Sequence, residues 1–133
     1  MRIVLIEDSP ADVRLFREVL QYSNLEVEVY HLPDGEVALE KLSSAGEPWT
    51  PRPDLVFLDL NMPSVGGFEV LRVLRTTPGY TDVPVAVFTS SRSLSDRDRA
   101  MELKADRFLS KPNTLSEFAD VISCTIREFD SSS

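Results

Sequence analysis

The sequence is poor in cysteine and histidine and holds no long apolar run. Its one cysteine, Cys124, cannot form a disulfide within the chain, which fits a reducing cytoplasm, and we expect it to be a small buried or half-buried apolar residue. The one histidine, His31, is expected to be structural or merely exposed. The apolar run that follows Met1-Arg2 is far too short to span a membrane, so we expect neither a leader nor a membrane partner.

Positive charge is also scarce. The 14 Lys and Arg residues stand against 22 Asp and Glu residues, and the resulting net charge of −8 argues against a nucleic-acid-binding surface, which would need a basic patch. Some basic residues gather late in the chain, and we interpret them as a solvated helix face: Arg92, Arg97, Arg99 and Lys104. The length of 133 residues suits one domain, so we expect a domain over residues 1–130 and a frayed tail at 131–133.

Short apolar runs that end in polar residues dominate what is present. Such runs, rich in β-branched residues and separated by helical patterns, are typical of buried parallel strands. They predict strands over residues 2–6, 26–31, 55–58, 84–88 and 107–110. The second run alternates apolar and charged residues, which is the pattern of a half-exposed edge strand.

Helix signals follow each predicted strand. Ser9 is the expected N-cap of the first helix and Thr114 that of the fifth, while the fourth is expected over 95–104. The fifth helix carries a predicted core stripe of Leu115, Phe118, Ile122 and Ile126. Prolines make residues 43–53 a loop, in which Trp49 is expected to cover the core. Five alternating pairs predict an α/β fold with a parallel sheet and helices on both faces.

Polar residues stand where four of the strands end, and the carboxyl ends of parallel strands form the sites of such sheets. They are Glu7-Asp8, Asp59 with Asn61, Thr89-Ser90 and Lys111-Pro112. Adjacent acids are stable when a cation neutralises them, and carboxylates without His or Cys favour Mg²⁺. Asp59 is then a candidate nucleophile toward a phosphoryl group, Lys111 a positive charge beside it, and Thr89 a hydroxyl donor.

Each of these residues alone is a common structural feature, since an aspartate at a strand end often only caps a turn. Two other functions fit the same topology less well. A flavin-binding electron carrier is disfavoured because the acids in the Glu-Asp-Ser-Pro turn (7–10) would repel a flavin phosphate. A phosphatase with an aspartyl nucleophile is disfavoured because position 61 is Asn, so the expected general acid is missing.

The motifs together resemble the receiver domain of two-component response regulators over essentially all of residues 1–130. The matching segments are Ile-Glu-Asp-Ser (6–9), Leu-Asp-Leu-Asn-Met-Pro (58–63), Gly-Gly-Phe-Glu (66–69), Phe-Thr-Ser-Ser (88–91) and Lys-Pro (111–112). The resemblance implies a flavodoxin-like (βα)5 fold with sheet order 2-1-3-4-5. It also implies a signalling module that catalyses only its own phosphorylation and dephosphorylation.

The resemblance implies a role for each site residue. Asp59 accepts phosphate from a sensor histidine kinase, and Mg²⁺ is bound by Asp8, Asp59 and the backbone carbonyl of Asn61, with Glu7 acting mainly through water. The expected phosphoryl-contact and switch residues are Thr89, Ser90, Lys111 and Phe108, and Pro112 is expected to follow a cis peptide bond. The Glu-Asp pair replaces a commoner Asp-Asp pair without loss of charge. Phe108 replaces a frequent Tyr and so lacks the phenolic hydroxyl.

A narrower resemblance links the chain to small stand-alone response regulators associated with bacterial phytochromes, which lack an output domain. It rests on the loop at 43–53 and on Thr-Ser-Ser-Arg-Ser (89–93). It implies a bacteriophytochrome kinase as partner, and a homodimer through helix four, strand five and helix five. Val121 and Cys124 lie off the core stripe and suggest a partner surface, unless they merely widen that stripe. A pseudo-receiver that docks without phosphorylation is the remaining alternative.

Overall fold

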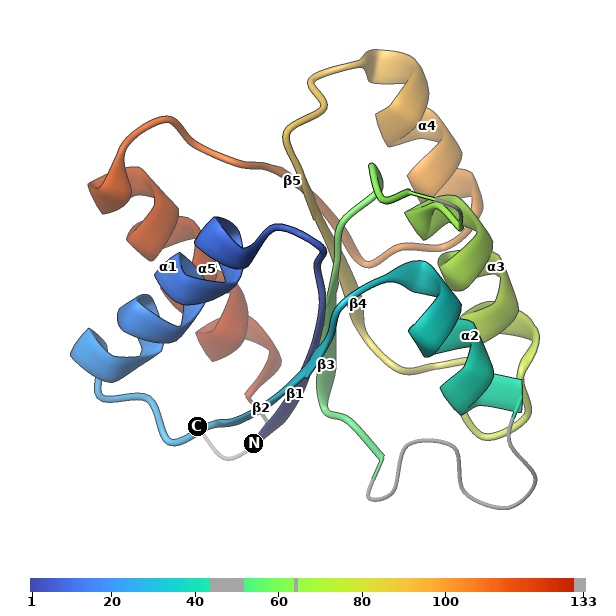
Figure 1. Cartoon of the computed structure of the whole chain (residues 1–133), viewed down its shortest axis with the longest axis horizontal. Helices are drawn as coiled ribbons and strands as arrows, with labels where there is room; N and C mark the ends of the chain where they lie inside the picture. The colour runs from blue at the N-terminus through green and yellow to red at the C-terminus, as the bar shows by residue number, and fades with distance from the viewer. Residues whose placement is uncertain (44–51, 64, 131–133) are drawn as a thin grey trace.

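The computed structural model describes residues 1–43, 52–63 and 65–130, in which five strands alternate with five helices (Figure 1). The strands are β1 (Arg2–Ile6), β2 (Glu28–Leu32), β3 (Leu55–Leu58), β4 (Val85–Thr89) and β5 (Arg107–Ser110). The helices are α1 (Pro10–Tyr22), α2 (Gly35–Ser43), α3 (Gly67–Thr76), α4 (Leu94–Glu102) and α5 (Leu115–Phe129).

The strands form one parallel sheet in the order β2-β1-β3-β4-β5, which confirms the predicted flavodoxin-like topology. Helices α1 and α5 cover one face of the sheet, and α2, α3 and α4 cover the other (Figure 1). The register pairs Ile6 with Leu58, Leu58 with Val87 and Thr89 with Ser110. The carboxyl ends of four strands therefore meet at one edge of the sheet.

A chain of aromatic rings fills the core between the sheet and the α1–α5 layer. Phe57 on β3 packs edge-on against Phe16 and Phe88, with ring centroids 4.9 and 6.2 Å apart, and Phe88 packs against Phe118 at 5.1 Å. All of β3 is buried. Dense packing of this kind resists deformation, so the sheet is a rigid support for the residues that follow its strands.

Three elements have bounds that differ from the predicted ones. Strand β2 begins at Glu28 rather than at residue 26, because its first partner is Arg2 at the start of β1. Strand β4 continues to Thr89, which pairs with Ser110 and so belongs to the sheet itself. Helix α4 ends at Glu102, two residues early, because Lys104 has a φ of 67° and turns the chain out of the helix.

Two predictions about α5 are wrong. Leu115 is 61% exposed and is not part of the core stripe, because it is the first residue of the helix and lies at a groove shared with Tyr22 of α1. Cys124 is exposed rather than buried. Trp49 and the tail at 131–133 lie outside the described residues. Across the part of the chain that the structure describes, no helix is long and apolar enough to cross a membrane.

Candidate functional site

Three acids meet at the carboxyl edge of the sheet. Glu7 and Asp8 follow β1, Asp59 follows β3, and one oxygen of each lies within 4.8 Å of the others. Glu7 is 2% exposed and Asp59 6%, whereas Asp8 is open to solvent. A set of carboxylate oxygens without nitrogen or sulfur ligands suits a hard divalent cation. The cluster could therefore bind such an ion, with its open side at Asp8.

Backbone contacts fix the loop that follows β3. The Asp59 amide donates to the Ile6 carbonyl at 3.0 Å, and the Gly67 amide donates to the Leu60 carbonyl at 3.1 Å. A Cβ atom at Gly67 would lie 2.3 Å from the Asp59 carbonyl oxygen, which no real Cβ tolerates. Glycine at the start of α3 therefore permits the helix to lie directly against the backbone that carries Asp59.

Lys111 joins the acids from the end of β5. Its Nζ atom lies 2.7 Å from Glu7 Oε1, 2.8 Å from Asp12 Oδ2 and 3.8 Å from Asp59 Oδ2, and its side chain is 11% exposed. Burial alone would lower the pKa of Lys111, but the hydrogen bonds and charges of Asp12 and Glu7 outweigh it and raise the pKa. The side chain therefore stays an ammonium ion at neutral pH.

Asp12 is a partner of Lys111 that the sequence motifs did not predict. Asp12 lies in the first turn of α1, where its amide donates to the Ser9 hydroxyl at 3.3 Å. The predicted N-cap at Ser9 was a usable signal, because it places the first turn of that helix at the same sheet edge as Glu7. The structure thus adds a fourth carboxylate, outside the cation cluster, to the surroundings of Lys111.

Glu7 is the acid most affected by its surroundings. Burial raises its pKa from 4.5 to about 7, and the nearby Asp59 charge adds to the rise, while Lys111 opposes it. A carboxylate in an ion pair would ordinarily have a lowered pKa, so here the loss of solvation outweighs the ion pair. A bound cation would offset the charge repulsion among crowded, buried acids of this kind. The raised pKa of Glu7 is therefore consistent with a cation site.

This pKa predicts a pH dependence of stability in the metal-free protein. Glu7 binds its proton more tightly in the folded state (about 7) than in the unfolded state (4.5), so the free energy of unfolding falls as the pH rises through this window. The expected slope is on the order of 1 kcal/mol per pH unit. Denaturant unfolding in EDTA measures it, and Glu7→Gln should remove the slope. An equal slope in both proteins would contradict the assignment to Glu7.

Asn61 connects Asp59 to Thr89. Its backbone amide donates to Asp59 Oδ1 at 3.4 Å, and its side-chain amide donates to the Thr89 hydroxyl, also at 3.4 Å. Thr89 is fully buried and accepts a second hydrogen bond from the Ser91 amide at 3.2 Å. Only a backbone role was predicted for Asn61, so the link made by its side chain is a finding of the structure.

The link continues from Thr89 to helix α4. The Ser91 hydroxyl donates to Asp96 Oδ2 at 2.6 Å, and the Asp96 amide in turn donates to the Ser93 hydroxyl that caps α4. Phe108 is half-buried on β5, opposite Val87, and packs on the core between the sheet and α2–α4. Hydrogen bonds and packing thus connect the candidate acceptor to the face formed by α4 and β5.

The remaining predicted residues also lie at this edge. Ser90 is exposed directly after Thr89, and Pro112 is half-buried after Lys111. The cis peptide before Pro112 stays a prediction. His31 is structural, as expected, because its Nε2 atom lies 2.7 Å from the Glu7 carbonyl oxygen.

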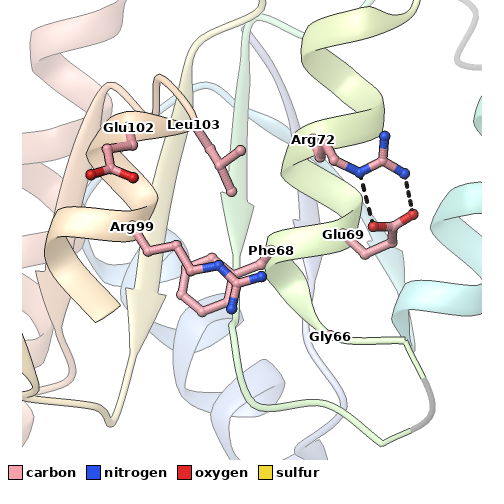
Figure 2. A pocket seen from close by; sticks show the side chains of 7 residues that line it. All are labelled: Gly66, Phe68, Glu69, Arg72, Arg99, Glu102 and Leu103. Atoms are coloured by element: carbon pink, nitrogen blue, oxygen red, sulfur yellow. Dashed lines mark hydrogen bonds and ion pairs between the residues drawn. The ribbon is translucent and has the colours of Figure 1, made fainter. Parts of the chain in front are cut away.

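A groove of about 400 Å³ lies between α3 and α4 (Figure 2). The guanidinium of Arg99 stacks over the Phe68 ring, 4.3 Å from its centroid, while Arg72 is paired with Glu69 on α3 itself. The basic residues of the 92–104 stretch are exposed, as predicted, but Arg99 is also a packing contact between the two helices. This contact joins α4 to the helix that begins beside the Asp59 loop.

An acidic cluster, a buried aspartate and a lysine thus meet at the carboxyl edge of a flavodoxin-like sheet. The chain belongs to the response regulator receiver domain family, whose pattern it matches over residues 3–123. The family assignment is the one that the sequence motifs predicted.

Relatives and solved structures agree with this assignment. Response regulator Rcp1 of Synechocystis sp. is 38% identical over 121 residues, which cover 90% of this chain and 82% of Rcp1. The crystal structure of the phosphorylated cyanobacterial phytochrome response regulator RcpA superposes with a TM-score of 0.88 at 32% identity, covering 99% of this chain and 95% of RcpA. The Mn²⁺-bound form of Rcp1 gives a TM-score of 0.87 at 34% identity, covering 99% and 96%.

Proposed function

We propose that this chain is a phosphorylation-switched signalling module in which Asp59 accepts a phosphoryl group from a sensor histidine kinase in a Mg²⁺-dependent reaction. The observation that carries the proposal is the setting of Asp59. Its carboxylate is buried at the end of the central strand β3, with Glu7 and Asp8 within 4.8 Å and the Lys111 ammonium 3.8 Å away. Asp59 thus lies beside both a group of acids suited to a cation and a positive charge.

The chemistry follows from these positions. An Asp59 oxygen attacks the phosphorus of a phosphohistidine, the bond between nitrogen and phosphorus breaks, and an acyl phosphate forms. Mg²⁺ bound by Glu7, Asp8, Asp59 and the Asn61 carbonyl would offset the negative charge on the transferred oxygens. Lys111, kept charged by its raised pKa, pairs with a phosphoryl oxygen from the opposite side. Thr89 and the exposed Ser90 offer hydroxyls at the same edge.

Labelling with a small phosphoryl donor tests this proposal. Incubation with acetyl phosphate and Mg²⁺ is expected to add one phosphoryl group to the protein by intact-mass measurement, and no group in EDTA. Asp59→Asn should not be labelled. Asp82→Asn, which removes an exposed acid paired with Arg52, is the matched control and should be labelled like the wild type. Full labelling of Asp59→Asn would contradict the assignment of Asp59 as the acceptor. An unlabelled wild type would favour the alternative of a receiver that docks without phosphorylation.

The proposed switch uses Thr89 and Phe108. A phosphoryl group on Asp59 attracts the Thr89 hydroxyl, which then leaves its partners Asn61 and Ser91. The space freed behind β4 lets the half-buried Phe108 turn further inward. Because Phe108 has no hydroxyl, the inward state gains only apolar burial. The affected surface is formed by α4, β5 and α5, which we take as the signalling face.

We also propose that this face forms a homodimer. Strand β5 is one of the two edge strands of the sheet. A groove of about 350 Å³ between β5 and α5 is lined in part by Leu109, Val121 and Cys124. Val121 is partly buried against the core, so only part of its side chain contributes to the apolar lining of the groove. Unpartnered apolar surface at a sheet edge favours a two-fold contact.

The dimer has a direct test. Light scattering at high protein concentration is expected to give the mass of two chains, and Cys124→Arg should shift the equilibrium toward one chain because it places a charge in the groove. Tyr22→Arg, at another exposed site on α1, is the control and should leave the mass unchanged. A monomer both with and without beryllofluoride would rule out the dimer.

The partner kinase that we propose is of the bacteriophytochrome kind. The support is the similarity to RcpA, which is a phytochrome response regulator, along essentially the whole length of both chains. The curated relative TrcR of Mycobacterium tuberculosis is 35% identical, but the matched part covers only 42% of that protein. The proposed partner therefore rests on RcpA rather than on TrcR, and we propose a cytoplasmic location for this receiver.

A further inference from the structure

Asp12 holds Lys111 from outside the cation cluster. Its carboxylate oxygen is 2.8 Å from Lys111 Nζ, and it belongs to α1 rather than to a strand end. The Ser9 cap fixes the backbone of Asp12, and the side chain is 28% exposed, so the ion pair is well placed and only partly solvated. Asp12 is therefore a defined partner of Lys111, rather than a carboxylate that meets it by chance.

The position of Lys111 shows which acids bind its ammonium group in the unphosphorylated protein. The ammonium makes hydrogen bonds to Glu7 and Asp12, and it lies 3.8 Å from Asp59, which is beyond hydrogen-bond distance. Glu7 is also part of the cation cluster, so a bound ion and Lys111 would share the Glu7 oxygens. Asp12 is then the acid whose oxygens remain free for Lys111.

We propose that Asp12 is a positioning residue that holds Lys111 in the unphosphorylated state and competes with the phosphoryl group for its ammonium. This inference rests on the proposed phosphorylation of Asp59. When the phosphoryl oxygens arrive, Lys111 must share or give up the Asp12 contact in order to bind them. The Asp12 carboxylate thereby weakens the phosphorylated state relative to the unphosphorylated state, and sets how readily the module switches.

Removing the charge of Asp12 should strengthen binding at the acceptor. Asp12→Asn keeps the shape of the side chain and a hydrogen-bond acceptor, but replaces an ion pair by a weaker neutral contact. At saturating Mg²⁺, beryllofluoride is then expected to bind about three- to tenfold more tightly than to the wild type. Glu18→Gln removes an exposed charge from the same helix away from Lys111, and should leave the affinity unchanged.

Calorimetric titration with beryllofluoride tests the inference without a kinase, so that any kinase contact with α1 plays no part. The variants are Asp12→Asn, Lys111→Met and the double variant, with Asp12→Ser as a second substitution if Asp12→Asn does not fold. The gain from Asp12→Asn should vanish when Lys111 is Met, because Asp12 acts through Lys111. A purely structural role of Asp12 would not produce this dependence.

The outcomes separate this inference from the proposed function. If the wild type does not bind beryllofluoride in the presence of Mg²⁺, the phosphorylation of Asp59 itself is contradicted. If the wild type binds, but Asp12→Asn binds equally or more weakly, the competition by Asp12 is overturned and Asp59 remains the acceptor. A gain that persists in the Lys111→Met background overturns it as well.

Discussion

Exchanging Arg75 for methionine is expected to lower the free energy of unfolding by about 3 kcal/mol, because it breaks a largely buried charged network. The Arg75 side chain, 12% exposed, donates to the carbonyls of Lys104 and Val83 at 2.8 and 2.7 Å and to Asp106 at 3.0 Å. Asp106 also accepts from the Val85 amide. Loss of the guanidinium removes the donor to both carbonyls and leaves Asp106 without its ion pair, where α3, β4 and β5 meet.

Denaturant unfolding monitored by circular dichroism measures this loss. Arg72→Met on the same helix is the matched control, because Arg72 makes an exposed pair with Glu69 that should contribute less than about 1 kcal/mol. Arg75 lies at the sheet edge opposite Asp59, so acetyl phosphate should still label the folded variant. Equal destabilisation by both substitutions would contradict the importance of the buried network.

Replacing Thr89 by alanine is expected to separate phosphorylation from switching. Asp59 keeps its carboxylate, the acidic cluster and Lys111, so beryllofluoride should still bind. The hydroxyl that connects Asn61 to Ser91 is lost, and with it most of the change expected at the α4–β5–α5 face. Amide exchange over residues 89–112, with and without beryllofluoride, measures that change.

The exchange experiment has a matched control in Thr76→Ala. This substitution removes an exposed hydroxyl at the end of α3, at the opposite edge of the sheet, and should leave the response like that of the wild type. The expected result is a clear change in protection for wild type and Thr76→Ala and a much smaller one for Thr89→Ala. Equal changes in all three proteins would show that the coupling does not pass through Thr89.

The gathering of Glu7, Asp59, Thr89 and Lys111 at one edge could be predicted from the apolar runs, whereas the sheet order followed only from the resemblance to receiver domains. Parallel strands have their carboxyl ends at the same edge of the sheet, so the polar residues that follow the apolar runs must all lie at that edge. The pattern of apolar runs fixes the edge without any knowledge of side-chain direction. This is why the placement of the site needed only local signals.

Contacts between elements could not be predicted in the same way. The Asp12–Lys111 pair and the Arg99–Phe68 stack each depend on the distance between a helix and another element, which no local pattern encodes. Helical spacing likewise placed Leu115 on the core stripe, although the first turn of α5 lies at a groove rather than in the core. The raised pKa of Glu7 depends on burial by the whole fold.

Chemical mapping of the phosphorylated residue tests the central claim most directly. Borohydride reduces an aspartyl phosphate to homoserine, so treatment after labelling with acetyl phosphate and Mg²⁺ marks the acceptor permanently in a peptide digest. We expect homoserine at position 59 and unmodified acids at Glu7, Asp8 and Asp12. Conversion at any of these three acids, or labelled protein without conversion at Asp59, would contradict the account.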